Sequence, residues 1–321
     1  YQRIPQYIRE HQGMTLAQFQ FIYWWEWTHR LLGRLIGAVF LLPFLLFAWT
    51  GAITRRDIPR MLVLFALGGL QGFVGWWMVE SGLETRVSVS QYRLAIHLGV
   101  ALILFAAILW TALEYLRPPP GSLRAPTSPQ GGGESKVQIS PPPTRGGRAA
   151  EAQAKAVLVR GLAFAFPILV YVQMLLGALV AGLHAGLIYN TWPSMDGRLL
   201  PEHPFFASPW WINFFENPGL AQFDHRIGAY IVAALALVVW WNAARLRMKG
   251  ATRVSAYAIL LITTVQIALG IETLLNQAPI LLSALHQLTA LSLLSAALWH
   301  AFEVRSYLRV LTTPIEQQPV F

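Results

Sequence analysis

Seven stretches of this chain are almost continuously apolar, and each is long enough to cross a lipid bilayer as a helix. A membrane-spanning helix needs roughly 17–25 mostly apolar residues. The stretches that meet this requirement are residues 31–53, 61–79, 94–113, 161–183, 227–244, 254–271 and 279–299. The pattern predicts an all-α integral membrane protein with seven spans.

Composition narrows the class further. Of the 321 residues, 55% are hydrophobic and 12% are charged, against about 25% charged residues in an ordinary soluble domain. The chain has no cysteine, which excludes a disulfide framework, an iron–sulfur cluster and a thiolate zinc site. The net charge is +9, and in so apolar a chain a basic excess indicates membrane orientation rather than nucleic-acid binding.

The basic residues gather on one side when the loops are assigned alternately to the two faces of the membrane. The segments near 54–60, 114–160 and 245–253, together with the C-terminus, hold 16 of the 24 Lys and Arg residues and 6 of the 15 acidic ones. By the positive-inside rule this side is the cytoplasm or the mitochondrial matrix. The N-terminus then lies outside, yet residues 1–30 contain no apolar stretch like that of a signal peptide. We therefore expect at least one further span upstream, which would make eight.

The segment 117–155 differs in composition from the rest of the chain. Its proline and glycine runs lie at 118–120, 131–133 and 141–143. Such a segment cannot bury enough apolar surface to offset its ordering entropy. We expect a flexible Pro/Gly-rich linker on the positive side, with a regulatory or docking role as the alternative. It divides the chain into an N-terminal helical bundle, 1–116, and a C-terminal helical bundle, 156–321.

The two sides of the linker resemble each other in sequence. The segment 26–33, Glu-Trp-Thr-His-Arg-Leu-Leu-Gly, matches 222–228, Gln-Phe-Asp-His-Arg-Ile-Gly, and each opens a span in the same direction. In both halves the next span carries a glutamine, Gln71 in the first and Gln266 in the second, and the span after it begins with a histidine. The histidines of this parallel repeat are His29 and His97 in the first half, and His225 and His286 in the second.

In each half, two histidines are expected at similar depth near the outer ends of neighbouring helices. This arrangement suits a cofactor held between helices of a bundle, and neutral imidazole is a common axial ligand of haem iron. One bis-histidine haem in each half is the preferred interpretation, and four interfacial histidines bonded to loop backbone are the alternative. The histidines outside this pattern are not expected to be ligands: His11, His184, His203 and His300.

The two halves differ at one titratable position. Glu26 precedes His29 by three residues, on the same helix face, and its counterpart in the second half is Gln222. A carboxylate beside a haem pocket can move protons, whereas an amide cannot. The first half is therefore expected to perform chemistry and the second to hold a permanent haem. An ion pair between Glu26 and Arg30 is the alternative role for this carboxylate.

Other polar residues near the outer ends leave their roles open. Four arginines could pair with haem propionates or reach lipid headgroups: Arg30, Arg34, Arg93 and Arg226. The outer loop 182–224 is rich in aromatic residues and proline, and we expect it to fold over the mouth of the bundle as a lid.

Taken together, these segments resemble haem A synthase of the alphaproteobacterial and mitochondrial type. The resemblance covers nearly the whole chain apart from the linker, and it is specific as a set. Its residues are 21–34, 71–79, 81–83, 177–182, 189–193, 213–217 and 222–226. The family's first helix and the outer loop after it have no counterpart in this sequence, and neither do the paired outer-loop cysteines that some relatives carry.

The resemblance implies eight helices in two four-helix bundles related by a pseudo-twofold axis. It implies that a ring methyl of haem O is oxidised to a formyl group through two hydroxylations and loss of water, giving haem A for cytochrome oxidase. His29 and His97 would then bind the substrate haem, with Glu26 assisting catalysis. His225 and His286 would ligate a b-type haem that passes electrons.

The resemblance also implies partners and a location. The partners are membrane lipid, haem O synthase and an electron donor such as a ferredoxin; a second copy of the chain is a further candidate, and nucleic acid is not expected. The location is the bacterial or mitochondrial inner membrane, with the linker and C-terminus on the cytoplasmic or matrix side. Two other functions stay open: a bis-histidine dihaem electron-transfer cytochrome without catalytic activity, and a haem carrier or assembly factor. Glu26 opposite Gln222 favours the enzyme, because an electron relay needs no carboxylate in one half only.

Overall fold

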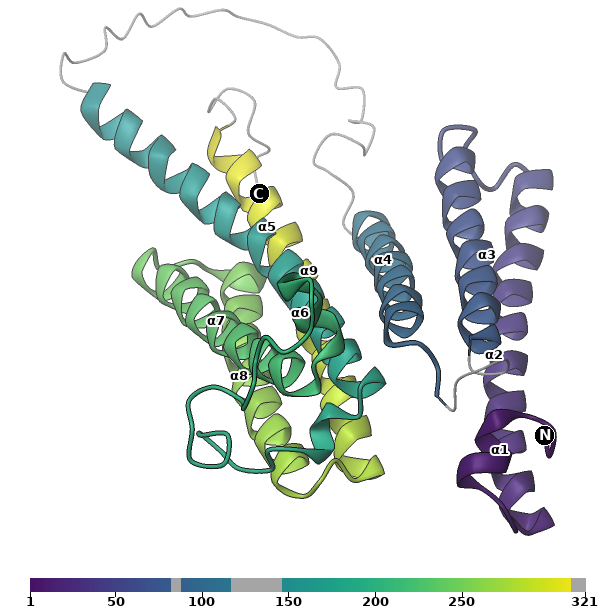
Figure 1. Cartoon of the computed structure of the whole chain (residues 1–321). Helices are drawn as coiled ribbons and strands as arrows, with labels where there is room; N and C mark the ends of the chain where they lie inside the picture. The colour runs from purple at the N-terminus through teal and green to yellow at the C-terminus, as the bar shows by residue number, and fades with distance from the viewer. Residues whose placement is uncertain (82–87, 117–145, 313–321) are drawn as a thin grey trace, which may run out of the picture. The chain divides into compact units, whose positions relative to one another are not determined.

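The computed structural model describes residues 1–81, 88–116 and 146–312, with side chains over 1–81, 88–116 and 153–306 (Figure 1). The regular secondary structure within these ranges is helical, which confirms the all-α prediction. In chain order the elements are α1 (Pro5–Glu10), α2 (Leu16–Trp49), α3 (Ile58–Glu80), α4 (Gln91–Leu116), α5 (Gly146–Gly182), η1 (Ala185–Leu187), η2 (Trp210–Ile212), α6 (Asn213–Glu216), α7 (Pro218–Arg245), α8 (Gly250–Leu275) and α9 (Ile280–Thr312).

Seven helices of the described part of the chain are long and apolar enough to cross a membrane, namely α2, α3, α4, α5, α7, α8 and α9. Large apolar side chains on their outer faces, such as Leu45, Ile103 and Leu237, are exposed in the isolated chain. Only helices and closed barrels satisfy all their backbone hydrogen bonds within lipid, so these faces suit contact with hydrocarbon. The seven predicted spans are confirmed, and the chain is a multi-pass membrane protein.

The first span begins well before its apolar stretch. Thr15 caps α2: its side chain accepts a hydrogen bond from the Gln18 backbone, and the Gln18 side chain accepts one from the Thr15 backbone. This reciprocal capping satisfies two amide groups that a helix start leaves without partners. Residues 31–49 of the stretch predicted at 31–53 therefore form the second half of a longer helix, which ends at Trp49, and residues 26–29 lie inside this helix.

The predicted linker meets helix earlier than expected. Helix α5 begins at Gly146, within the range 117–155, because the segment after the last proline run is rich in Ala, Glu, Gln and Lys, which favour helix. The residues 117–145 lie outside the described part of the chain. The proposed halves, 1–116 and 156–321, stay a prediction.

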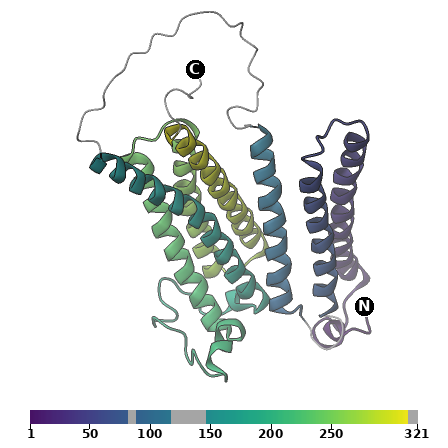
Figure 2. The same ribbon diagram turned by 90° about the horizontal axis from the view of Figure 1, so that it is seen from above.

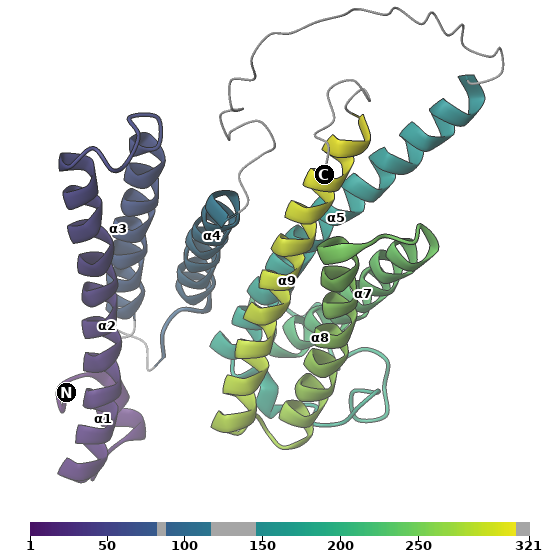
Figure 3. The same ribbon diagram turned by 180° about the vertical axis from the view of Figure 1, so that it is seen from behind.

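Contacts between residues divide the chain in another way, into two compact units that each take parts of several helices. The first comprises Tyr1–Ile108, Tyr171–Tyr230 and Ala268–Gln287; the second comprises Leu109–Val170, Ile231–Ile267 and Leu288–Phe321. In the first unit, α2 and α3 lie side by side in all three ribbon views (Figure 1, Figure 2 and Figure 3). Phe40 on α2 stacks on Phe65 of α3 with ring centroids 6.2 Å apart.

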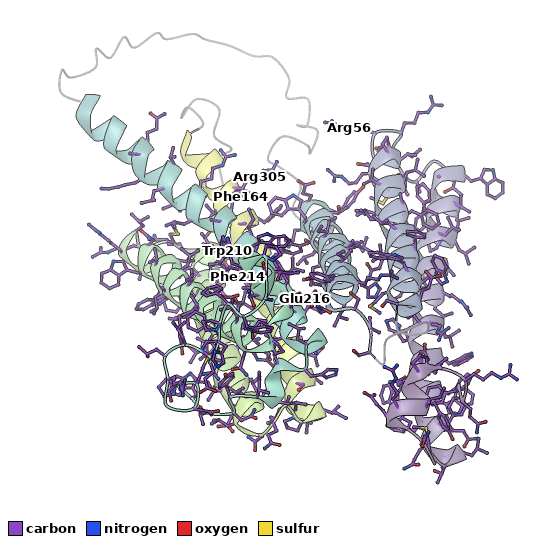
Figure 4. The ribbon with its side chains drawn as sticks, in the orientation of Figure 1. Arg56, Phe164, Trp210, Phe214, Glu216 and Arg305 are labelled. Carbon is purple, nitrogen blue, oxygen red and sulfur yellow. The ribbon has the colours of Figure 1, made fainter. Side chains whose placement is uncertain are left out.

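Two asparagines organise the outer loop of the first unit. Asn213 is fully buried, and its side chain bonds to both backbone groups of Ala207 and to the Trp210 carbonyl. This places Trp210 and Phe214 edge to face at 6.0 Å (Figure 4). Asn217 bonds in the same manner to the carbonyls of residues 203 and 204 and to two amides at the start of α7. The loop is thus held by side-chain to backbone bonds.

The core of the second unit combines large buried side chains, such as Phe166 and Ile259, with several small ones. Its buried alanines include Ala163, Ala236, Ala256, Ala297 and Ala301. Small residues let membrane helices approach closely, which gains van der Waals contact where lipid offers no hydrophobic driving force. A polar cluster lies in the same unit, where Arg305 pairs with Glu114 at 3.1 Å and lies 5.7 Å from the Trp110 ring.

Replacing Asn213 by alanine should loosen the outer loop. The change leaves the Ala207 amide and two carbonyls without their partner, at a cost of about 1–3 kcal/mol, which is roughly a five-fold or greater rise in the open fraction. Limited proteolysis of the purified protein in detergent should show faster cleavage within residues 199–212. Asn276→Ala is the matched control, because the Asn276 amide is exposed and bonds to its own helix at Glu272. Equal cleavage rates in the two variants would contradict the role given to Asn213.

Candidate functional site

The two histidines predicted to pair in the second half lie close together. His225 on α7 and His286 on α9 have ring centroids 6.4 Å apart, with their planes at 77°. Two imidazoles that bind one metal ion from opposite sides place their centroids roughly 6 Å apart, because each metal–nitrogen bond is about 2 Å long. Both rings are half-buried. Their separation suits a metal ion held between them.

A glycine on a neighbouring helix receives the edge of three of the four repeat histidines. In each case the ring atom nearest to a Cβ added at the glycine is Cε1, followed by Nδ1 and then Nε2. The added Cβ would approach Cε1 to 2.8 Å for Gly75 and His97, 2.9 Å for Gly270 and His286, and 3.1 Å for Gly177 and His225. The three rings are therefore seated in the same way, in positions that a larger residue would obstruct.

A glutamine stands four residues before each of these glycines, at Gln71, Gln173 and Gln266. Gln71 Nε2 lies 3.1 Å from Nδ1 and 3.3 Å from Nε2 of His97. Gln173 Nε2 lies 3.0 Å from Nδ1 of His225 and donates to the His225 carbonyl at 2.8 Å. The sequence analysis found Gln71 and Gln266 but missed Gln173, because the internal repeat was aligned from residue 222 onward and α5 precedes it. The shared Gln-x-x-x-Gly spacing was the signal that could have found it.

The first-half histidines also lie near each other. His97 on α4 is half-buried, and His29 on α2 is exposed in the isolated chain. The two rings are within range of electrostatic interaction. Their joint binding of one haem stays a prediction.

The position at which the halves differ has a clear local structure. Glu26 forms an ion pair with Arg30 one turn further along α2, so the contact expected as its alternative role is present. The equivalent contact in the second half joins Gln222 Oε1 to Arg226 at 2.9 Å. Gln222 is buried and also donates to the Ala185 carbonyl at 2.7 Å. The amide is thus fixed by the fold, while Glu26 is half-exposed.

Besides Arg30, two more of the outer arginines have partners within the protein. Arg93 donates to the Trp77 carbonyl at 2.7 Å and lies 4.5 Å from the centre of the Trp77 ring. Arg226 donates to the carbonyls of Tyr189 and Ser194, at 2.8 Å and 3.1 Å. The Arg226 contacts tie the loop 182–224 to α7. Whether that loop acts as a lid stays a prediction, as does the pairing of any arginine with a haem propionate.

The histidines outside the repeat have other surroundings. His300 is 3% exposed, and its Nδ1 lies 2.9 Å from Ser255 Oγ. His11 contacts the Tyr1 hydroxyl at 2.6 Å. Within the described residues, no group of three or more His, Cys, Asp or Glu side chains gathers as a metal site. Haem iron needs only one or two axial ligands from the protein, so a pair of imidazoles is sufficient for it.

Comparisons with known proteins identify the family to which this site belongs. The profile of the family described as cytochrome oxidase assembly protein matches residues 1–298. The chain is 43% identical to heme A synthase of Bradyrhizobium diazoefficiens, over 98% of this chain and 79% of that protein. It is 46% identical to heme A synthase of Rhodopseudomonas palustris, over 94% of this chain and 73% of that protein.

The chain belongs to the haem A synthase family. It is a haem-modifying oxidoreductase of the membrane. The residues of the second half fit a haem by two observations: the 6.4 Å separation of His225 and His286, and the glycines that leave room for both ring edges. Neutral imidazole nitrogen is also the donor type that haem iron accepts.

Gly177→Ala should displace the His225 ring and weaken haem retention. The new methyl carbon would lie 3.1 Å from Cε1 of the ring, so the ring must shift by a few tenths of an ångström. Overpacking of this kind costs about 1–3 kcal/mol, which is about a five-fold or greater loss of affinity. The haem-to-protein ratio and the low-spin absorption bands of purified protein measure it. Gly161→Ala on the same helix is the control, because its added Cβ meets no atom within 4 Å. An unchanged haem ratio in Gly177→Ala would show that the ring is not seated there when haem is bound.

Proposed function

We propose that this haem A synthase oxidises a ring methyl of haem O to a formyl group, by two successive hydroxylations followed by loss of water. His29 and His97 hold the substrate haem. His225 and His286 hold a b-type haem, which supplies one-electron transfer when bound. The observation that carries the proposal is the matched seating of His97, His225 and His286 against glycines on neighbouring helices.

The residues of the first half have two proposed roles, which are to orient the substrate haem and to transfer protons. The glycine and glutamine beside His97 set the ring's position, and a fixed ring sets the orientation of the haem it binds. Orientation matters because a correctly placed reacting group avoids the entropic cost of finding its partner. The methyl group to be oxidised is then held in one position through both hydroxylations.

Glu26 is proposed as the residue that moves protons in the first half. Its ion pair with Arg30 keeps the carboxylate in a defined position one turn from His29. The second half has a buried amide at the same place, held by the Ala185 carbonyl and Arg226, and an amide cannot take up a proton near neutral pH. This difference supports the assignment of chemistry to the first half and of electron supply to the second.

The charge distribution also supports an orientation in the membrane and a class of partner. The basic segments around Arg55, Arg56 and Arg245 are placed on the cytoplasmic side of the bacterial inner membrane by the positive-inside rule. An electron donor such as a ferredoxin and the haem O synthase are proposed as partners. Acidic electron donors suit a basic face, because complementary charge steers encounter.

The decisive experiment incubates the purified protein with haem O, oxygen and a reductant system, and identifies the extracted haems by chromatography. Formation of a formyl haem is expected. A protein that keeps a low-spin haem but yields neither the alcohol nor the formyl product would instead be an electron-transfer cytochrome. A protein that binds and releases haem O unchanged, without a resident haem, would be a carrier.

Glu26→Gln should keep haem binding and slow conversion. Losing a positioned proton-transfer group costs roughly 10²–10⁴-fold in rate, and accumulation of the alcohol is expected if the second hydroxylation is the more dependent step. Product ratios over time measure this. Glu202→Gln is the matched control, because Glu202 forms an exposed i,i+4 ion pair with Arg198 in the outer loop. Wild-type conversion by Glu26→Gln would reduce Glu26 to its ion pair.

A further inference from the structure

Two of the glutamines that stand four residues before these glycines place a side-chain amide against a ring nitrogen of the histidine. Gln173 Nε2 lies 3.0 Å from Nδ1 of His225, and Gln71 Nε2 lies 3.1 Å from Nδ1 of His97. Both come from the helix against which the ring is seated, four residues before the glycine. Each ring therefore meets a glycine at Cε1 and a side-chain amide at Nδ1, and at His97 the amide nitrogen also lies 3.3 Å from Nε2.

The other end of each amide has no hydrogen-bond partner. Gln71 Oε1 and Gln173 Oε1 are buried, and in the described part of the chain neither meets a donor. A buried polar atom without a partner costs free energy, and such an atom in a functional site requires an explanation. Each of these two amides thus has an unsatisfied acceptor oxygen close to a histidine ring.

Metal binding changes what the Nδ1 atom needs. A histidine that binds metal through Nε2 carries its proton on Nδ1, and this N–H is usually donated to an oxygen acceptor that fixes the ring and raises its basicity. With Nε2 of the amide beside Nδ1, the ring nitrogen is the acceptor. Half a turn about the last torsion of the glutamine exchanges the two ends of the amide and brings Oε1 to Nδ1. At Gln173 this turn also gives up the hydrogen bond from Nε2 to the His225 carbonyl at 2.8 Å, in exchange for the bond that Oε1 accepts from Nδ1.

The packing around Gln173 gives its amide a defined position. A Cβ added at Gly228, three residues after His225, would overlap Gln173 Oε1. Gly228 therefore leaves the space in which the amide oxygen lies. The ring, the amide and this glycine form one packed set on α5 and α7.

We propose that Gln173 and Gln71 are positioning residues, whose side-chain oxygens accept the Nδ1 proton of His225 and His97 when those rings bind haem iron. The inference rests on the proposed function, because it takes the two histidines as haem ligands. Gln173 then sets the orientation and donor strength of the b-type haem ligand, and Gln71 does the same for the substrate site. A stronger acceptor at Nδ1 makes the imidazole a better donor, which favours ferric iron and lowers the reduction potential.

The test measures the midpoint potential and the low-spin electron paramagnetic resonance signal of the b-type haem in the purified full chain. Gln173→Glu keeps the volume and supplies a stronger acceptor, so the midpoint potential should fall. Gln173→Leu removes the acceptor, so the potential should rise and the signal should broaden as the ring loses its fixed orientation. Gln71→Leu should leave the b-type haem potential unchanged and weaken retention of haem O several-fold.

Two further variants keep the result interpretable. Asn242→Leu replaces an amide on α7 that bonds to its own helix at Val238, and it should match the wild type. Gly228→Ala displaces the Gln173 amide without altering the ring or the glutamine itself, and it should shift the potential in the direction of Gln173→Leu. If Gln173→Leu does not accumulate, Gln173→Glu and Gly228→Ala decide the question.

The possible failures are distinguishable. Wild-type protein without any low-spin haem would overturn the proposed function. Wild-type protein with the haem, but with one common potential and signal for Gln173→Glu, Gly228→Ala and the wild type, would overturn the role of Gln173 alone. A shift of the b-type haem potential by Gln71→Leu equal to that of Gln173→Leu would show a general packing effect and would also overturn it.

Discussion

Close approach of an imidazole edge to a helix backbone is the contact on which this site depends. His97, His225 and His286 each place Cε1 within 2.8–3.1 Å of the position that a Cβ would take at the facing glycine. The helices that carry the rings and the glycines must therefore pack at short distance along their outer thirds. In lipid, where apolar association gains little, such close packing supplies much of the stabilisation. The contacts between these glycines and histidines would therefore both position the proposed haem ligands and hold the helices together.

The duplicated design also explains how one difference could separate two roles. Both halves place an arginine one turn after the differing position, so both can hold the residue there by a charged partner. In the second half that residue is buried against the loop carbonyls of Ala185 and Ile188. A carboxylate at Gln222 would lose both of these bonds, since it has no N–H to donate. The loop therefore favours an amide in the second half, while the half-exposed position in the first half tolerates a charge.

Much of this architecture follows from the sequence because it depends on local patterns. Apolar length determines the seven spans, and the recurrence of His29, His97, His225 and His286 predicts which residues pair. The i,i+4 contact of Glu26 and Arg30 follows from helix geometry. The helix α2 begins at Leu16, well before the apolar stretch that predicts its span, because the capping pair of Thr15 and Gln18 starts the helix there. Gln173 was missed for a different reason: its role is visible only when α5 is known to lie against His225, which is a tertiary contact.

The outer loop links segments from both sides of the linker in sequence. Glu216 accepts a hydrogen bond from the Tyr92 hydroxyl of α4 at 2.6 Å, while the same loop is fastened to α7 by Gln222 and Arg226. A cut within residues 117–145 would place Tyr92 and Glu216 on different fragments. Co-expressed fragments would then meet at this hydrogen bond without a covalent link.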